Sequence, residues 1–410
     1  MFLILLTCAC FKLHAQVNYV LNPSFEKYLK CPFFLDQIKY AANWYPLDTL
    51  GNPDSVLHTP ECTPDYCNTC DTINNGPLGL NVPSSDYFYQ YPRTGNGMVQ
   101  VRMLLDSAVY AGGLPDLRDY LQGRLSERLI NGKKYCVTFY ANLEEISYYA
   151  IDKIGAYLDD GSINVGQDSA GCARPQTAYT PQVYATSVIN DTLNWVQVQG
   201  SFFANGTEKY ITLGNFFDFA HTDKVHTWAG DGVVFYLIDD VSVIESDAVA
   251  DAGPDAAVSA GSDSAWIGPH EEGWPCRWRI AGDTTVISVY TGFKVHPDTT
   301  TKYVMELDLC DNVTFDTVTV YVAPAGIKPL TPKGGPSVFP NPTSGVFTIE
   351  HAKGCEVVVY DVVGSARLTM IPTNDKQQVD IGELANGVYS VVITDPATKE
   401  RTTQMLVKAR

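Results

Sequence analysis

Basic residues are scarce in this sequence of 410 residues. Lys and Arg number 28 against 46 Asp and Glu, so the formal net charge is −18. The sequence contains no basic stripe that could neutralise phosphates, and this excludes nucleic acid as an expected partner. An acidic surface is compatible with soluble export and with divalent cations.

Long hydrophobic runs are also missing. Residues 1–11 form an apolar stretch that is too short to cross a bilayer, and residues 13–15 (LHA) resemble a small-residue cleavage site. We therefore expect residues 1–15 to be a signal peptide. No later segment is apolar enough to be a transmembrane segment.

The motifs of common enzyme classes are absent. The sequence has no G-x-S-x-G, H-E-x-x-H, P-loop or G-x-G-x-x-G pattern. His221 and His226 flank Asp223, but their spacing of five gives no common face on a strand or helix. We expect a protein without enzyme activity, and a cryptic hydrolase that uses two carboxylates is the alternative.

The residues that are abundant predict β-structure. Only 18% of the chain is charged, 11% is aromatic, and 32 Gly and 24 Pro supply many turns. Asn-Gly and Asp-Gly turns separate segments in which polar and apolar residues alternate. These predicted strands are 134–143, 194–204, 208–217 and 233–244.

One helix is expected between these strands. Leucines recur at every fourth residue from Leu117 to Leu129, after a Pro-Asp pair and before Asn131-Gly132. This spacing, with a proline start and a glycine stop, predicts an amphipathic helix. Its expected place is over a sheet or over one end of a sandwich.

Composition divides the chain into three β modules. The first spans residues 17–245 and the second spans 249–323. Residues 324–337 form a linker rich in Pro and Gly, and the third module spans 338–410. From residue 324 onward the 9 basic and 8 acidic residues nearly cancel, which marks the same boundary.

Cysteine usage suits an oxidising compartment. Nine of the 11 cysteines follow residue 15, and the first two modules hold six and two of them. We expect Cys276 and Cys310 to bridge the sheets of the second module. The candidates in the first module are Cys31, Cys62, Cys67, Cys70, Cys136 and Cys172. Zinc binding by the run CTPDYCNTC is the alternative to disulfides.

Residues 338–410 resemble the C-terminal sorting domain of type IX secretion cargo from Bacteroidetes. The resemblance rests on a basic end and on three segments, which are FPNPTSG (339–345), VVVYDVVG (357–364) and LANGVYSVVI (384–393). It implies contact with the type IX export machinery and passage through the periplasm. The protein would then be secreted or held at the outer-membrane cell surface.

The other two modules carry resemblances of their own. DAGPD (251–255) and TTTKY (299–303) make the second similar to Ig-like spacers of the polycystic-kidney-disease type. NPSFE (22–26) and FYLIDDVSV (235–243) make the first similar to galactose-binding-like jelly-roll modules that bind carbohydrate. The predicted fold class is therefore all-β and multidomain, with a jelly-roll β-sandwich followed by two smaller Ig-like β-sandwiches.

The jelly-roll resemblance also implies a structural Ca²⁺, for which Glu26 and Asp240 are the matching residues. Calcium binds six to eight oxygens from carboxylates and carbonyls. Because adjacent residues of a strand face opposite ways, only one of Asp239 and Asp240 is expected to point at such a site. The alternative is a set of solvated carboxylates at strand ends.

Sugar recognition requires exposed aromatic faces on loops or on a concave sheet. Trp228 lies in a polar, glycine-containing loop and is the first candidate, and Tyr148 and Tyr149 come next. The predicted function is a secreted or cell-surface binding protein that recognises a glycan or another surface ligand. A structural or adhesion component with protein partners, similar to gliding-associated surface proteins, is the alternative.

Overall fold

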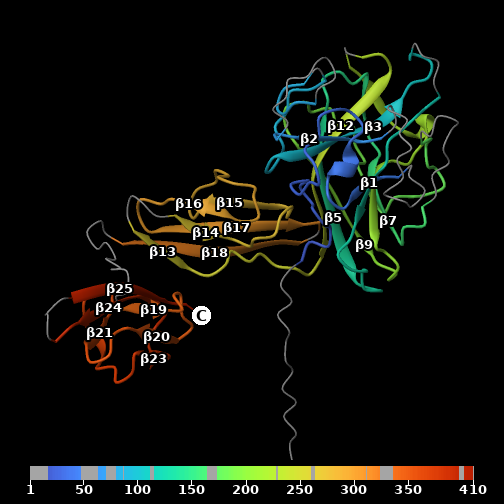
Figure 1. Ribbon diagram of the computed structural model, residues 1–410. Coiled ribbons are helices and arrows are strands. Elements are labelled where there is room, and N and C mark those ends of the chain that lie inside the picture. Colours follow the sequence, from blue (N-terminus) through green and yellow to red (C-terminus); the bar gives the residue numbers. More distant parts are fainter. Residues whose placement is uncertain are drawn as a thin grey trace, which may run out of the picture.

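The chain forms three groups of strands that share no sheet (Figure 1). We call them the head (residues 17–245), the middle module (249–323) and the C-terminal module (337–409). The computed structural model describes residues 17–47, 63–70, 80–85, 87–110, 115–163, 173–227, 230–259, 264–310, 312–323, 336–396 and 401–409.

The predicted all-β class is confirmed. The described residues contain two 3₁₀ turns, η1 (Ile38–Tyr40) and η2 (Phe219–His221), and otherwise strands, bends and turns. Within this described part, no helix has the length and apolar character that crossing a bilayer demands.

The head is a sandwich of two five-stranded antiparallel sheets. The first sheet has the order β1 (Trp44–Pro46), β4 (Leu121–Arg124), β10 (Tyr210–Asn215), β7 (Ile154–Asp159) and β8 (Val183–Tyr184). The second has the order β2 (Asp65–Asn68), β3 (Gly97–Leu105), β12 (Val233–Glu245), β5 (Lys134–Leu143) and β9 (Val196–Phe203). A separate ribbon pairs β6 (Tyr149–Ile151) with β11 (Lys224–His226).

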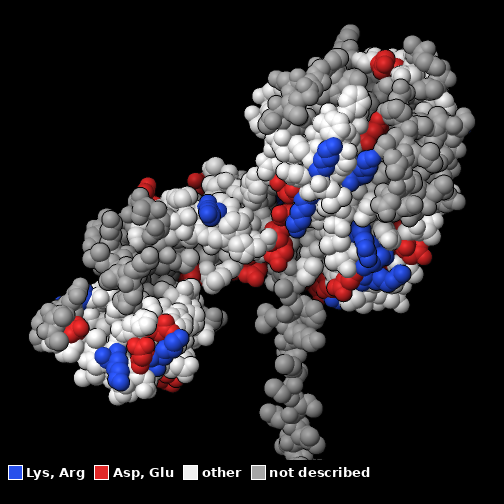
Figure 2. All heavy atoms as spheres, viewed as in Figure 1, with Lys and Arg blue, Asp and Glu red and all other residues white. Residues whose placement is uncertain are grey.

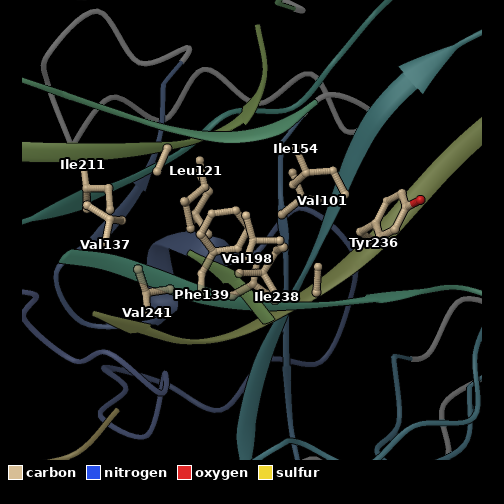
Figure 3. Close-up of a cluster of buried hydrophobic side chains, with 14 of the residues drawn as sticks. Val101, Leu121, Val137, Phe139, Ile154, Val198, Ile211, Tyr236, Ile238 and Val241 are labelled. Atoms are coloured by element: carbon tan, nitrogen blue, oxygen red, sulfur yellow. The ribbon is translucent and has the colours of Figure 1, made fainter. Parts of the chain in front are cut away.

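The core of the head lies between the two sheets (Figure 3). Val137 and Phe139 of β5 and Ile238 of β12 meet Leu121 of β4 and Ile211 of β10, and all five side chains are fully buried. Alternation placed Val137, Phe139, Ile211 and Ile238 in strands correctly. The four predicted strands agree with β5, β9, β10 and β12 to within two residues at each end.

The predicted helix over residues 117–129 is wrong. Leu121 opens strand β4, which pairs with β1 and β10, while Leu117 and Leu129 lie in the flanking segments. The leucines of this repeat are at most 2% exposed. A spacing of four is an even number, so it keeps side chains on one face of a strand as well as on one face of a helix. Pairing with the neighbouring strands β1 and β10 favours the strand over the helix.

The middle module contains a four-stranded sheet and a two-stranded ribbon. The sheet has the order β13 (Ala256–Ser259), β18 (Asn312–Ala323), β17 (Thr301–Leu309) and β15 (Cys276–Ile280). The ribbon pairs β14 (Ala265–Ile267) with β16 (Phe293–Val295). Its core includes Cys136 and Ile244 of the head, so the two modules pack against each other.

The C-terminal module has a three-stranded and a four-stranded sheet around its own core. The first has the order β19 (Ser337–Phe339), β20 (Val346–Glu350) and β23 (Lys376–Asp380). The second has the order β22 (Ala366–Met370), β21 (Glu356–Tyr360), β24 (Gly387–Thr394) and β25 (Arg401–Lys408).

The expected Cys276–Cys310 bridge is wrong. Cys310 pairs with Cys136 of the head across 174 residues, and Cys276 is a buried free thiol. The bridge joins two modules because the end of β17 packs against β5 and β9, where the backbone N–H of Cys310 donates to Gln199 Oε1. A second disulfide, Cys31–Cys70, lies within the head.

The remaining cysteine candidates have different outcomes. Cys67 is a buried free thiol in β2, and Cys62 and Cys172 lie outside the described residues. Cys355 is a half-buried thiol of the C-terminal module.

Candidate functional site

The β6–β11 ribbon carries an aromatic cluster that includes two of the predicted ligand residues. The rings of Tyr148 and Tyr149 lie 4.7 Å apart and nearly perpendicular, and the His226 ring lies 4.4 Å from that of Tyr148. Antiparallel pairing of Tyr149 with His226 brings these residues together. Trp228 lies outside the described residues, but the chain leading to it passes this cluster, because Thr227 N donates to Tyr148 O at 3.1 Å.

A carboxylate adjoins the aromatic cluster. The Tyr149 hydroxyl donates to Asp106 Oδ2 at 2.9 Å, and burial together with this hydrogen bond raises the pKa of Tyr149 to about 12. Tyr149 is therefore a neutral donor at physiological pH, and His226 stands exposed beside it. The cluster can stack against a ring and exchange hydrogen bonds with hydroxyl groups.

The other histidine of this segment lies in a different setting. His221 Nδ1 lies 2.7 Å from Asp218 Oδ1 on the exposed turn η2. Asp223 instead donates its backbone N–H to Asp152 Oδ1 at 2.8 Å. The pattern of His221, Asp223 and His226 in the sequence thus corresponds to three separate local interactions.

A bulge in β12 brings both Asp239 and Asp240 to the same turn. The pairing register shifts after Asp239, and Asp240 has a positive φ of 49°. Asp239 Oδ2 accepts from Arg93 N at 2.7 Å, while Asp240 Oδ1 accepts from Thr94 Oγ1 at 2.6 Å. The expectation that the two carboxylates face opposite ways is wrong, because a bulge breaks the alternation of a strand.

Arg93 compensates the charge of this pair. Its guanidinium forms an ion pair with Asp240 Oδ2 and lies 3.5 Å from the centre of the Tyr140 ring. Asp240 is fully buried, and burial together with the charge of Asp240 raises the pKa of Asp239. We call Arg93, Thr94, Asp239 and Asp240 the buried ion cluster.

Glu26, the other predicted calcium ligand, is bound to the segment before β3. Its Oε1 accepts from Asn96 N at 2.6 Å and from Gly97 N at 2.8 Å. With Arg93 paired to Asp240, N–H and O–H donors already occupy the carboxylate oxygens that calcium would need. These residues do not fit a calcium site, and no group of three His, Cys, Asp or Glu among the described residues has the arrangement of a metal site.

Glu26 and Asp240 instead line a cavity of about 220 Å³ where the head meets the middle module. The middle module contributes Trp266, Glu272 and Tyr290 to its wall. Tyr290 closes one side, because its hydroxyl accepts from Gly95 N at 3.0 Å.

Sequence reasoning missed the residues of the middle module because this part was expected to be a spacer. A compositional signal was nevertheless present, since three of the six Trp lie between residues 265 and 278, in AWIGPHEEGWPCRW. That stretch also carries a histidine and two glutamates. A packed core alone would not require those charged residues between the tryptophans.

Comparison with known structures gives similarities of low TM-score. The CBM22-1 xylan-binding domain of Xyn10C from Paenibacillus barcinonensis is 13% identical, and the match covers 58% of this chain and all of that domain, with a TM-score of 0.28. The K3 cleaved adhesin domain of Lys-gingipain from Porphyromonas gingivalis is 15% identical over 56% of this chain and 99% of its own, with a TM-score of 0.27.

A third similar structure is PorZ, a surface component of the type IX secretion system of Porphyromonas gingivalis. It is 20% identical, with a TM-score of 0.17, and the match covers 26% of this chain and 15% of PorZ. Comparison with curated protein sequences gave no match.

The C-terminal module matches a protein family. Residues 337–408 match the family described as the secretion system C-terminal sorting domain, and this span contains every strand from β19 to β25. The predicted sorting domain is thereby confirmed. This chain carries a type IX C-terminal sorting domain and is exported to the cell surface or into the medium.

Proposed function

We propose that the head is the ligand-binding part of this exported protein and that it recognises a glycan at the β6–β11 ribbon. The observation that carries the proposal is the convergence of Tyr148, Tyr149 and His226 on a ribbon outside both main sheets. Sugar rings present C–H faces that pack on aromatic rings, and their hydroxyl groups need polar partners. The Asp106 carboxylate beside Tyr149 is such a partner.

A glycan array tests this proposal. The full chain is applied with calcium and again with a chelator, together with the variants Tyr148→Ala and Trp228→Ala. We expect glycan signals from the wild-type chain that fall at least tenfold in Tyr148→Ala, because one stacking face is lost. Phe203→Ala is the matched control, since Phe203 is 70% exposed and lies in β9 rather than in the ribbon. Signals that Tyr148→Ala leaves unchanged, or no signal from the folded chain, would contradict the proposal.

A second function, adhesion through a protein partner, is favoured by one surface patch of the head. The patch consists of Tyr28, Leu29, Phe33 and Phe34, whose side chains are 42–77% exposed. The Cys31–Cys70 disulfide fixes this loop, and Lys30 Nζ lies 4.5 Å from the centre of the Phe33 ring. Exposed apolar patches of this kind mark contact surfaces. Cell binding that survives Tyr148→Ala but falls with Leu29→Asp would support this second function.

A further inference from the structure

The cavity between the head and the middle module has the features of a preformed binding site. Three contacts fix its two walls relative to each other. The Cys136–Cys310 disulfide joins the modules covalently, Gly95 N donates to Tyr290 Oη, and Asn18 Nδ2 donates to Glu272 O at 3.3 Å. A ligand that enters this cavity therefore meets side chains that are already in place.

The wall of the cavity is acidic. Glu26 comes from the head, Glu271 and Glu272 come from the middle module, and none of the described lining residues is Lys or Arg. Asp240 also lines the cavity, but its charge is compensated by Arg93. Figure 2 shows acidic side chains gathered where the two modules meet.

Two polar atoms of this wall have no partner. Glu272 Oε2 and Trp274 Nε1 are buried atoms without a hydrogen bond to any described residue, and the Trp274 side chain is only 1% exposed. Buried polar groups are nearly always paired, so each such atom requires an explanation. Both residues line the cavity, so a small shift of either side chain toward it would let a bound ligand supply the missing partner.

The charges of the wall also repel one another. Burial raises the pKa of Glu26, hydrogen bonds from Asn96 and Gly97 lower it, and the charge of Glu272 raises it further. The charge of Glu272 thus reaches Glu26 across the boundary between the modules. A cation between them would remove this repulsion.

An aromatic surface completes the site. The Trp266 indole is 41% exposed and stacks on the His270 ring, with centroids 4.5 Å apart and planes 16° apart. Indole faces attract organic cations and pack against sugar rings or alkyl chains. A bare metal ion would use neither this face nor a volume of about 220 Å³.

From these observations we propose that the cavity binds a protonated primary amine on a small organic group. The ammonium pairs with the Glu272 carboxylate and lies in the field of Glu26, whose oxygens already accept hydrogen bonds from Asn96 and Gly97. The carbon skeleton packs on Trp266. Two sources carry this group, namely an amino sugar and a lysine-like alkylamine. The site is separate from the β6–β11 ribbon, so this inference does not depend on the glycan proposal.

Calorimetric titration of the full chain tests the inference with two pairs of probes. Glucosamine is compared with N-acetylglucosamine, and Nα-acetyl-lysine methylamide with its Nε-acetylated form. In each pair only the first compound carries a charged amine. We expect at least one amine to bind ten times more tightly than its neutral counterpart, and the tighter of the two identifies the source.

Two variants locate the binding. Glu272→Gln keeps the shape of the side chain and removes its charge, and we expect amine affinity to fall at least tenfold. Trp266→Ala alters an exposed residue, so it stays informative if Glu272→Gln fails to fold, and it should give a similar loss. Glu127→Gln, an exposed glutamate of the head, is the matched control and should change nothing.

Three results would overturn the inference. The first is equal affinity for charged and neutral probes, and the second is no binding of either amine. The third is calcium chloride binding tightly while the amines do not, which would make the acidic wall a metal site.

Discussion

The buried ion cluster and the cavity beside it differ in how their carboxylates are satisfied. Asp239 and Asp240 receive hydrogen bonds from Arg93 and Thr94, and a guanidinium lies against them. Across the cavity, Glu272 keeps an oxygen without a partner, and its charge raises the pKa of Glu26. Both groups are acidic, and both border the same space.

This difference separates structural charge from charge that is available for binding. Removing the partner of a fully paired, buried carboxylate strongly destabilises the folded protein. A buried carboxylate without a partner already lowers the stability of the folded protein, and a bound ligand that pairs with it raises that stability. Variants of the two groups should therefore have opposite effects.

The largest expected effect comes from breaking the buried ion cluster. Arg93→Ala leaves two buried carboxylates without a counter-charge, and we expect a loss of about 3–5 kcal/mol in the free energy of unfolding. Urea unfolding of the full chain measures it. Arg277→Ala is the control, because Arg277 pairs with Glu306 but is 47% exposed, and such a pair contributes less than about 1 kcal/mol. Equal losses in both variants would show that burial does not distinguish them.

Removing the disulfide between the modules should have the next largest effect. With Cys136→Ala and Cys310→Ala together, the unfolded chain loses a cross-link, which costs about 2–4 kcal/mol of stability. Amine binding should weaken as well, since the walls of the cavity are no longer joined. Cys355→Ala provides the comparison, because that thiol is free and lies in the C-terminal module. Unchanged amine affinity in the double variant would mean that non-covalent contacts fix the cavity by themselves.

A third acidic group sharpens the comparison through its pH dependence. Burial raises the pKa of Asp36 from 3.8 to about 7, and the charge of Asp119 acts in the same direction. Hydrogen bonds from Thr63 and the charge of Arg102 act in the opposite direction. Between pH 3.8 and about pH 7 the folded chain keeps the Asp36 proton, whereas the unfolded chain has lost it. The contribution of Asp36 to stability is therefore fully present below about pH 4 and is lost as the pH rises to 7.

Urea midpoints between pH 4 and pH 8 measure this effect. Asp36→Asn should flatten the decline in stability toward neutral pH. Asp160 has the opposite sign, because hydrogen bonds from Ser162 lower its pKa, so its contribution is lost as the pH falls. If the urea midpoint falls equally steeply with pH in Asp36→Asn and in the wild-type chain, other groups cause the decline in stability.

Local pattern was sufficient for much of the fold and for part of the candidate site. The alternation of polar and apolar residues located β5, β9, β10 and β12, and FPNPTSG with its companion segments located the sorting domain. Tyr148 and Tyr149 were predicted from one short segment, and the ribbon brings His226 to them. Each of these features depends on residues that are close in the sequence.

The features that the sequence did not predict depend on contacts between distant residues. The leucines from 117 to 129 fit a helix and a strand equally well until β4 pairs with β1 and β10. Cys310 pairs with Cys136 because the modules pack together, and the β12 bulge turns Asp240 toward Thr94. The cavity combines residues more than 200 positions apart, as Glu26 and Glu272 show. Nothing in a local pattern specifies such a meeting.

The most direct test of this account is the free energy of unfolding of Glu272→Gln, with and without a saturating amine. Without the amine we expect the variant to be as stable as the wild-type chain or slightly more stable, because a repulsive charge is gone. With glucosamine or the lysine amide, the wild-type chain should gain stability and the variant should not. A variant that is less stable by more than about 1 kcal/mol, with an unchanged gain from the amine, would place Glu272 with the structural charges and contradict the account.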